Sequence, residues 1–310
     1  MRWIKLFKRK KAFKETNYKK KYRRLKIITL LITLFTVWLI YSNFNYLVFK
    51  FLISYNYAYT VVLDEIYEEA IGYENIKGYF RNFDDTVIAV YSDKIREVGD
   101  DRYTFLYTPI EYNFSRDSER EVAKGIFIEE LTNDTVLLYI PNISKQTREF
   151  IENNTDVLAQ YSNVIIDLRG NLGGRLDDMY KIADLFLERG MIIAAEQTRM
   201  SLTSRTAVAG RNTPLVYENI YIVVNGRTAS AAEGLTMALS ENLDNVTIIG
   251  LKTFGKGIGQ ITIPLKYGFA TRATTMETRT PSGNTINRVG IMPDIIFDDD
   301  DILDYILGRL

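Results

Sequence analysis

Apolar residues are distributed in two different ways along this 310-residue chain. Near the N-terminus, residues 27–49 form an uncharged run of 23 residues between Lys26 and Lys50. A helix of roughly 20 apolar residues is long enough to cross the core of a bilayer. From residue 126 onward, short apolar runs alternate with segments of helical periodicity. The sequence therefore predicts a transmembrane helix followed by a layered α/β body.

The second half of the chain carries most of the predicted secondary structure. Apolar runs predict strands within 125–131, 135–143, 163–168, 219–224 and 246–249, and antiparallel segments at 260–265 and 270–276. Helical periodicity predicts helices over 145–160, 176–188 and 229–239. Strands that alternate with helices in this way are typical of an α/β fold.

Residues 50–125, which lie between these two patterns, combine predicted helical and extended segments. With this region included, the sequence divides into four parts. Within it we expect a helix or helix pair over 52–72, a helix over 88–95, an extended segment over 104–114 and an exposed segment over 115–125. The four predicted parts are a basic arm of residues 1–26, a transmembrane signal anchor of residues 27–49, a helical and small α+β cap region of residues 50–125, and an α/β core of residues 126–310.

Charge is strongly asymmetric although the whole chain is neutral. Residues 1–26 contain 13 Lys and Arg against the single acid Glu15, so the remaining residues carry a net charge of −12. Positive charge beside a span favours the cytoplasmic side, which predicts a single-pass protein with a cytoplasmic N-terminus and a body outside. Residues 41–44 (YSNF) lack the small-residue pattern of a cleavage site, so we expect an uncleaved anchor. No nucleic-acid partner is expected.

The absence of His and Cys excludes several kinds of chemistry. A Ser-His-Asp triad, a cysteine nucleophile, a disulfide framework, a Cys/His zinc site and a Cys-linked lipid anchor all need one of these residues. The acidic run 298–301 lacks the spaced glycine and closing glutamate of a calcium loop. We therefore expect no metal and no cofactor.

Two loops at predicted strand ends are candidates for a site, namely residues 167–174 (DLRGNLGG) and 225–234 (NGRTASAAEG). Ligands of α/β sheets gather beyond the carboxyl ends of strands. Three glycines allow the first loop to turn sharply and to present backbone N–H groups. In the second loop Ser230 precedes a helix, where a serine is either a cap or an exposed nucleophile.

Lys256 lies between Gly255 and Gly257, an uncommon setting for a solvated lysine. Glycines on both sides let the backbone close in around the amine, and a desolvated lysine has a lowered pKa. Such a lysine can take a proton from a serine hydroxyl, so Lys256 is the best base for Ser230 in a chain without histidine. The alternative is a surface turn with a charged tip.

Four blocks of sequence in fixed order resemble the C-terminal processing peptidases, or tail-specific proteases, a family of Ser/Lys serine peptidases. The blocks are 164–174 (VIIDLRGNLGG), 223–234 (VVNGRTASAAEG), 248–260 (IIGLKTFGKGIGQ) and 280–295 (TPSGNTINRVGIMPDI). The resemblance implies a crotonase/ClpP-like core, with Ser230 as nucleophile, Lys256 as base and Gln260 as the residue that assists the lysine. It also makes 126–310 a peptidase core.

We expect the N–H groups of Gly173 and Ala231 to stabilise the oxyanion of a tetrahedral intermediate. Glu233 could orient the helix start or bond to the first loop, or it could simply interact with the helix dipole. Asp167 and Arg169 are predicted to pair. Glu241 stands where some members of the family have an aspartate, and its role stays open.

The predicted layout departs from the family in one respect. Members usually carry a PDZ module before the core, whereas here only residues 115–125 separate the extended segment 104–114 from the first core strand, so we expect no PDZ. A PDZ-less, membrane-anchored layout is similar to the nisin resistance protein, which has a comparable TASSAE serine motif. The sequence thus predicts an extracytoplasmic serine endopeptidase acting on peptides or C-terminal tails, with lantibiotic resistance as one role.

Two other functions remain as alternatives. One is a catalytically silent, membrane-tethered peptide-binding or sensor protein on the same fold. The other is an acyl-CoA enzyme of the crotonase type, which the predicted location outside the membrane disfavours because CoA is absent there.

Overall fold

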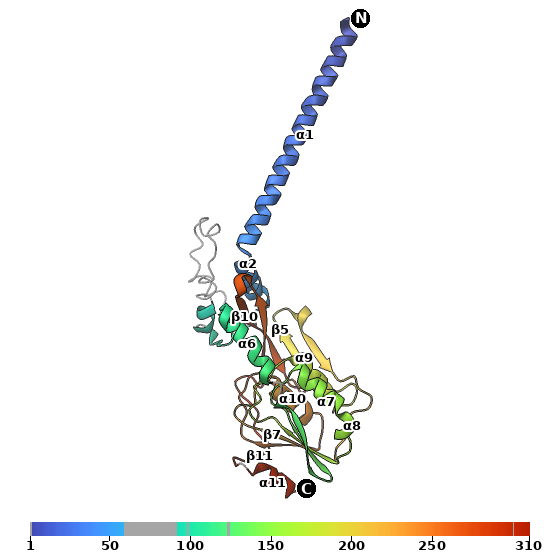
Figure 1. Ribbon diagram of the computed structural model, residues 1–310, viewed down its shortest axis with the longest axis vertical. Coiled ribbons are helices and arrows are strands. Elements are labelled where there is room, and N and C mark those ends of the chain that lie inside the picture. Colours follow the sequence, from blue (N-terminus) through green and yellow to red (C-terminus); the bar gives the residue numbers. More distant parts are fainter. Residues whose placement is uncertain (1, 59–91, 98, 123–124, 300) are drawn as a thin grey trace.

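The computed structural model describes residues 2–58, 92–97, 99–122, 125–299 and 301–310. Figure 1 shows a long helix projecting from one end of a layered body, with the C-terminus at the opposite end of that body. The long helix is α1 (Arg2–Ser42), and α2 (Phe44–Phe51) follows it. Within α1, Asn17–Ser42 is long and apolar enough to cross a membrane, a test that a signal sequence also passes. The expected span of residues 27–49 is thus interrupted after Ser42.

Six strands form a mostly parallel sheet, in the order β11-β8-β7-β4-β3-β2. Neighbouring strands are parallel except for the antiparallel pair β2 and β3. The strands are β2 (Phe127–Thr132), β3 (Thr135–Tyr139), β4 (Asn163–Asp167), β7 (Asn219–Val224), β8 (Val246–Gly250) and β11 (Ile295–Ile296). All of β4 is buried, which explains why its sequence is a continuous apolar run rather than an alternating one.

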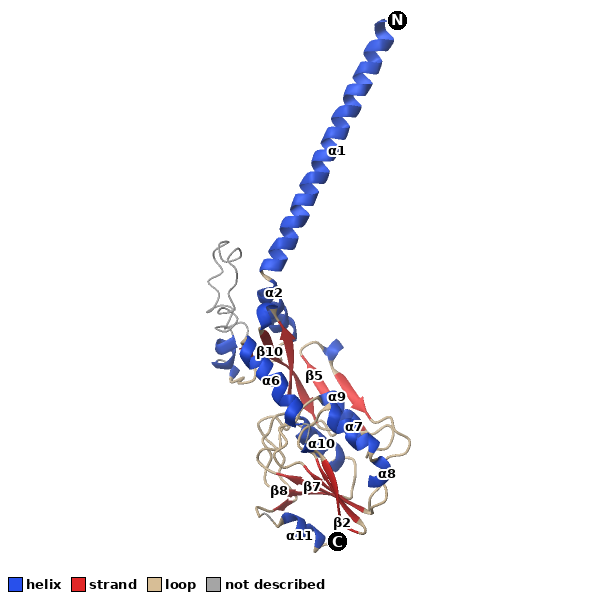
Figure 2. Ribbon diagram, in the orientation of Figure 1, coloured by secondary structure: helices blue, strands red, loops and turns tan. Residues whose placement is uncertain are grey.

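Helices cover both faces of this parallel sheet, as Figure 2 illustrates. Ile166 of β4 belongs to the core beneath α9 and α10, while its neighbour Ile165 packs with Ile302 and Ile306 of α11 on the other face. The helices are α7 (Lys145–Asn153), α8 (Thr155–Leu158), α9 (Leu176–Ala183), α10 (Ala231–Ser240) and α11 (Ile302–Leu307). The mixed α/β fold predicted from the sequence is therefore confirmed.

A second, antiparallel sheet has the order β1-β10-β5-β6, and β9 also pairs with β10. The strands are β1 (Phe105–Tyr107), β5 (Ile192–Thr198), β6 (Arg205–Val208), β9 (Ile258–Pro264) and β10 (Ala270–Arg279). Short turns of 3₁₀-helix, η3 (Ser201–Thr203) and η4 (Lys266–Gly268), connect β5 to β6 and β9 to β10. The antiparallel segments expected at 260–265 and 270–276 are confirmed, whereas β5 and β6 were not predicted.

The prediction of an extended segment over 104–114 was largely wrong, and the segment 115–125, for which only exposure was predicted, is mostly helical. Only β1 is extended, and α6 (Pro109–Val122) occupies most of both segments. The helix starts where Thr108 donates from its hydroxyl and its backbone N–H to the carboxylate of Glu111, at 2.8 and 2.9 Å. The Thr108 hydroxyl oxygen in turn accepts from the Glu111 N–H at 3.3 Å. This reciprocal capping, with proline in the first turn, is a helix-start signal that outweighed the β-like residues.

Other helix predictions need smaller corrections. The helix expected over 145–160 is divided between α7 and α8, because Asn154 leaves the helical conformation. The helix expected over 176–188 ends at Ala183. The helix expected over 88–95 is present from residue 92, and the rest of that prediction, like residues 59–72 of the predicted helix pair, lies outside the described residues.

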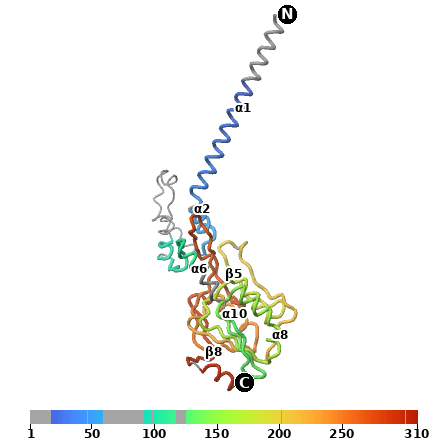
Figure 3. The backbone as a smooth tube through the Cα atoms, viewed as in Figure 1, coloured from blue at the N-terminus to red at the C-terminus, as the bar shows by residue number. Residues whose placement is uncertain are grey.

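The segment after α1 packs on the second sheet. The π-helix η1 (Leu52–Asn56) follows α2, and Leu52 and Ile53 share a small buried core with Leu265 and Ala273. Figure 3 shows this N-terminal segment beside the β9–β10 hairpin, although the two are some 200 residues apart in the chain. The hairpin therefore connects the base of α1 to the interior of the body.

Candidate active site

Ser230 lies at the turn from β7 into α10, in a backbone conformation that is rare for a non-glycine residue. Its φ is 58° and its ψ is −121°. The turn is held by the preceding loop: Ala229 N–H donates to the Asn171 carbonyl, and the Thr228 hydroxyl donates to the Leu168 carbonyl, both at 2.9 Å. Strained strand-to-helix turns of this kind present a side chain at the top of a sheet. Ser230 is half-buried there.

The first glycine loop packs directly against this turn. Gly173 has a φ of 96°, and a Cβ on it would lie 2.7 Å from the Cβ of Ser230 and from the carbonyl oxygen of Ala229. Gly174 has a φ of 151°, and its Cβ would overlap the carbonyl oxygen of Ile143. Both positions therefore require glycine, because a side chain would force the loop away from Ser230.

The Lys256 loop is closed by the fourth sequence block. A Cβ on Gly255, whose φ is 87°, would lie 2.8 Å from the N atom of Gly290, and one on Gly257 would lie 2.6 Å from the N atom of Asn287. The N–H of Arg288 donates to the Gly255 carbonyl at 2.8 Å. The flanking glycines thus allow close backbone approach, as expected, but the approaching backbone comes from residues 287–290.

Glu233 joins the two loops that carry Ser230 and Lys256. Its side chain is fully buried and accepts four hydrogen bonds. Oε2 accepts from the N–H groups of Ser230 and Lys256, each at 2.8 Å, so those two nitrogen atoms lie no farther apart than twice that distance. Oε1 accepts from the Thr253 hydroxyl at 2.5 Å and from the Gly255 N–H at 2.8 Å. Of the roles considered for Glu233, orientation of the helix start fits these hydrogen bonds. The loop to which it also bonds is the lysine loop, not residues 167–174.

The amine of Lys256 occupies a half-buried position beside cationic and aromatic groups. Its Nζ lies 4.8 Å from the centre of the Tyr103 ring. Burial, which disfavours the charged form, lowers the pKa of Lys256 to about 8, and the nearby Arg272 adds to that lowering. The carboxylates of Glu233 and Asp101 act in the opposite direction. About one Lys256 in ten is therefore neutral at pH 7 and able to accept a proton.

Gln260 has a different partner from the one expected. Its Oε1 accepts from Arg272 Nη2 at 3.0 Å, and Arg272 Nη1 donates to the Tyr107 hydroxyl at 3.0 Å. The Nε2 atom of Gln260 is buried and has no hydrogen-bond partner among the described residues. Neither the side chain of Lys256 nor that of Ser230 forms a hydrogen bond with Gln260 in the described part of the chain. The guanidinium fixes the amide because only the oxygen of glutamine can accept from it.

The two expected oxyanion donors differ in availability. The Gly173 N–H donates to Asn171 Oδ1 at 2.8 Å, and Asn171 Nδ2 in turn donates to the Ile140 carbonyl at 2.9 Å. The Ala231 N–H, at the first position of α10, donates to no acceptor within the described part of the chain. Of these two N–H groups, that of Ala231 is the one without an acceptor among the described residues.

Two acidic residues noted in the sequence have structural partners. Asp167 pairs with Arg169 at 2.7 Å, as expected. Glu241, at the end of α10, accepts from the N–H of Ser282 at 2.7 Å, which ties the fourth block to the helix that Ser230 precedes. Neither residue contacts Ser230 or Lys256 through a hydrogen bond.

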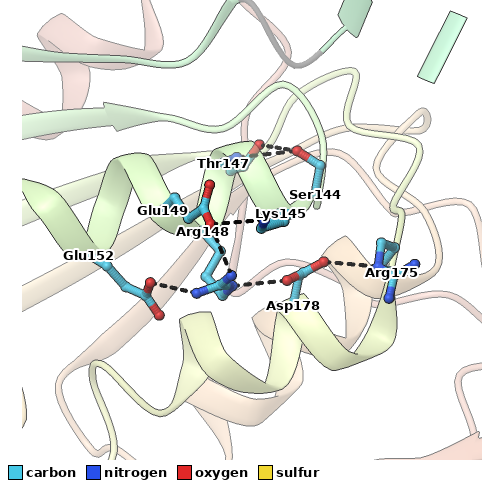
Figure 4. A network of polar contacts seen from close by, with 8 residues as sticks. All are labelled: Ser144, Lys145, Thr147, Arg148, Glu149, Glu152, Arg175 and Asp178. Carbon is cyan, nitrogen blue, oxygen red and sulfur yellow. Dashed lines mark hydrogen bonds and ion pairs between the residues drawn. The ribbon is translucent and has the colours of Figure 1, made fainter. Parts of the chain in front are cut away.

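An ion-pair network, drawn in Figure 4, includes the residue that directly follows the glycine loop. The buried carboxylate of Asp178 on α9 accepts from Arg148 of α7 at 2.9 Å and from Arg175 at 3.1 Å. Arg148 also pairs with Glu152 at 2.6 Å. Because Arg175 directly follows Gly174, the network fixes the end of the loop that packs on Ser230.

Residues from the predicted cap region also complete the site, and no sequence motif pointed to them. Tyr103 faces the lysine, and the adjacent Asp101 is buried and accepts hydrogen bonds from the hydroxyls of Tyr57, Thr104 and Thr274 at 2.9, 2.6 and 3.1 Å. The contacts with Tyr57 and Thr274 join residues that are 44 and 173 positions apart. A local motif cannot encode such a contact, which explains why these residues were missed.

Several known proteins are similar to parts of the chain. A carboxy-terminal-processing protease of Bartonella bacilliformis is 39% identical over 143 residues, which are 46% of this chain and 32% of that protein. A Staphylococcus aureus protein named "Probable CtpA-like serine protease" is 35% identical over 139 residues, or 44% of this chain and 27% of that protein. The matched part thus covers less than one third of either relative.

A structural relative extends over more of the chain. The structure of a lipoprotein from Streptococcus agalactiae aligns with a TM-score of 0.61 over 85% of this chain and 95% of that chain, at 18% identity. At that identity the likeness shows a shared fold.

The family assignment follows from the sequence profile. Peptidase family S41 matches residues 134–297, more than half of the chain, and the match includes both Ser230 and Lys256. It confirms the resemblance to C-terminal processing peptidases that the four blocks indicated. The chain belongs to peptidase family S41.

Proposed function

We propose that the protein is a membrane-anchored serine endopeptidase in which Ser230 is the nucleophile and Lys256 the general base. The observation that carries the proposal is the Glu233 carboxylate, which bonds to the backbone N–H of both residues and holds their loops together. A lysine with a pKa of about 8 and a serine on a strained turn are suited to acyl transfer without histidine.

The reaction proceeds through an acyl-enzyme. Neutral Lys256 takes the hydroxyl proton of Ser230 as its oxygen attacks the peptide carbonyl, and the resulting ammonium gives that proton to the leaving amine. Water then attacks the ester, with the same lysine as base, and releases the acid product. Gln260 assists Lys256 in this scheme, and Arg272 holds the amide of Gln260 in place.

The oxyanion is stabilised first by the N–H of Ala231, which is free of other acceptors in the described residues. Gly173 becomes the second donor when its N–H leaves Asn171 Oδ1 and turns toward the substrate oxygen. Catalytic hydrogen bonds often form only with substrate bound, so this rearrangement is consistent with the geometry of the free protein.

The proposed location is outside the cytoplasmic membrane, with residues 1–26 inside and a single-pass anchor formed by the part of the expected span 27–49 that lies in α1, as far as Ser42. A cap of residues 50–125 precedes the peptidase core of 126–310. The apolar segment Asn17–Ser42 and the basic charge before it support this topology. Peptides or protein C-terminal tails are the proposed substrates, as the name of the Bartonella relative suggests. The net charge of −12 after residue 26 would attract cationic peptides such as lantibiotics.

The test is a cleavage assay on the full chain in detergent, with nisin and with an unfolded protein that has an apolar C-terminus, analysed by mass spectrometry. We expect products that disappear in Ser230→Ala and Lys256→Met while the melting temperature is not lowered. Ser240→Ala and Lys252→Met, which change the same residue types elsewhere, should keep activity.

The substrate that is cleaved distinguishes the roles. Cleavage of nisin alone would assign lantibiotic resistance, and trimming of the unfolded chain would assign tail-specific proteolysis. Activity that persists in Lys256→Met would refute the dyad. Failure of a serine-directed acylating probe to label Ser230 would favour the catalytically silent binding protein.

A further inference from the structure

The turn between β9 and β10 contacts the end of the predicted membrane span. The backbone N–H of Lys266 donates to Asn45 Oδ1 at 2.8 Å. The Lys266 amine lies 3.4 Å from the centre of the Tyr41 ring and 5.6 Å from that of Phe44. Since Tyr41 is in the last turn of α1, this turn of the body lies at the level where the span ends.

The same turn displays an aromatic ring to its surroundings. Tyr267 is 78% exposed and has a φ of 61°, a left-handed conformation that is unfavourable for a tyrosine. Gly268, with a Cβ position 3.2 Å from Pro109, brings the start of α6 alongside, where Ile110 is 82% exposed. Two large apolar side chains therefore lie unburied next to the end of α1.

A second turn reaches the same end of the body. Arg199 donates to the carbonyl of Ser54 in η1 at 2.6 Å, which ties the β5–β6 turn to the segment that follows α2. At the tip of this turn Leu202 is 96% exposed. In Figure 1 both turns lie at the end of the body from which α1 projects, opposite to the C-terminus.

We propose that these two turns form a second membrane contact, in which Tyr267 and Leu202 enter the headgroup region of the bilayer that α1 crosses. The partner is therefore a lipid surface, and the inference rests on the membrane anchoring proposed above. Tyrosine prefers the membrane interface, and Lys266 and Arg199 beside the turns are suited to lipid phosphates. Burial in the interface also explains why two large side chains, Leu202 and Tyr267, project from these turns without packing on the body.

The contact fixes the height of the active site. β9 runs from the lysine loop to the membrane turn, and Lys256 and Lys266 are ten residues apart. At about 3.3 Å per extended residue, the site lies about 30 Å above the membrane boundary. A substrate anchored in the same membrane would need about ten extended residues between its anchor and the cleaved bond.

The test uses the full chain, which has no cysteine, so each introduced cysteine carries one spin label. Labels are placed at four exposed residues, and the protein is inserted in nanodiscs of phosphatidylcholine and phosphatidylglycerol. The variants are Leu34→Cys in α1, Leu202→Cys and Tyr267→Cys in the two turns, and Val216→Cys, which matches the 78% exposure of Tyr267 but precedes β7. Power saturation compares collisions with oxygen, which concentrates in lipid, and with a nickel chelate, which stays in water.

We expect the labels at residues 34, 202 and 267 to favour oxygen and the label at 216 to favour the nickel chelate. If the label at 34 is in lipid while those at 202 and 267 behave like 216, the second contact is refuted and the anchor stands. If the label at 34 is in water, the proposed anchoring fails and this inference fails with it. Unchanged melting temperatures check that each variant is folded.

Discussion

Replacing Glu233 by glutamine tests whether one carboxylate joins the two catalytic loops. Each carboxylate oxygen accepts two hydrogen bonds, and three of the four donors are backbone N–H groups. Glutamine has nearly the same shape, but its NH₂ group cannot accept a hydrogen bond. In either amide orientation at least one backbone N–H loses its acceptor.

The magnitude follows from which donors are left unpaired. If the NH₂ faces Thr253, that hydroxyl can rotate and accept, and only the Gly255 N–H is orphaned. If it faces the other way, the N–H groups of both Ser230 and Lys256 are orphaned. A buried unpaired donor costs about 1–3 kcal/mol, and hydrogen bonds to a charged acceptor are stronger than those to a neutral one. We expect Glu233→Gln to lower the free energy of unfolding by about 2–5 kcal/mol.

The assay is denaturant unfolding together with steady-state kinetics, with exposed Glu188→Gln as the control for the loss of one negative charge. We expect kcat to fall because the loops of Ser230 and Lys256 separate. The residual activity should extend to lower pH, since the carboxylate of Glu233 raises the pKa of Lys256. A free energy of unfolding within about 0.5 kcal/mol of wild type, with wild-type kcat, would refute the bridging role.

Three further outcomes are expected. First, kcat/KM should rise about tenfold per pH unit up to about pH 8 and then level off, because only neutral Lys256 accepts the serine proton; a flat profile from pH 6 to 9 would contradict this. Second, Arg272→Gln should move that rise to higher pH, because the guanidinium lowers the pKa of Lys256; an unmoved profile would exclude its influence. Third, Gly173→Ala should abolish activity, because its Cβ would lie 2.7 Å from that of Ser230. The control Gly190→Ala, with a similar φ of 98° and no neighbour within 4 Å of the new Cβ, should lower stability alone. Circular dichroism melts measure the stability of both variants, and peptidase assays measure their activity.

The parallel sheet could be predicted from the sequence because its strands are buried on both faces. The strand expected over 219–224 has the same bounds as β7. A short continuous apolar run is typical of a strand that helices cover on both faces. β5 was missed because its pattern is broken by Glu196, a buried carboxylate that pairs with Arg205 at 2.8 Å and accepts from Tyr180. The partner of such a charge lies on another element, so the local sequence indicates a loop.

The location of the site can be predicted from local sequence, whereas the chemistry of the site depends on tertiary contacts. Both loops could be placed at strand ends from the local sequence, but the pKa of Lys256 is set by burial and by Arg272, which lies on the second sheet. Tyr103, from the cap, faces the same amine. A glycine-flanked lysine in a different tertiary setting would stay solvated and charged at neutral pH. The proposed base at this site therefore depends on the packing of the second sheet and the cap on the loop, and changes in that packing should alter activity through the pKa of Lys256.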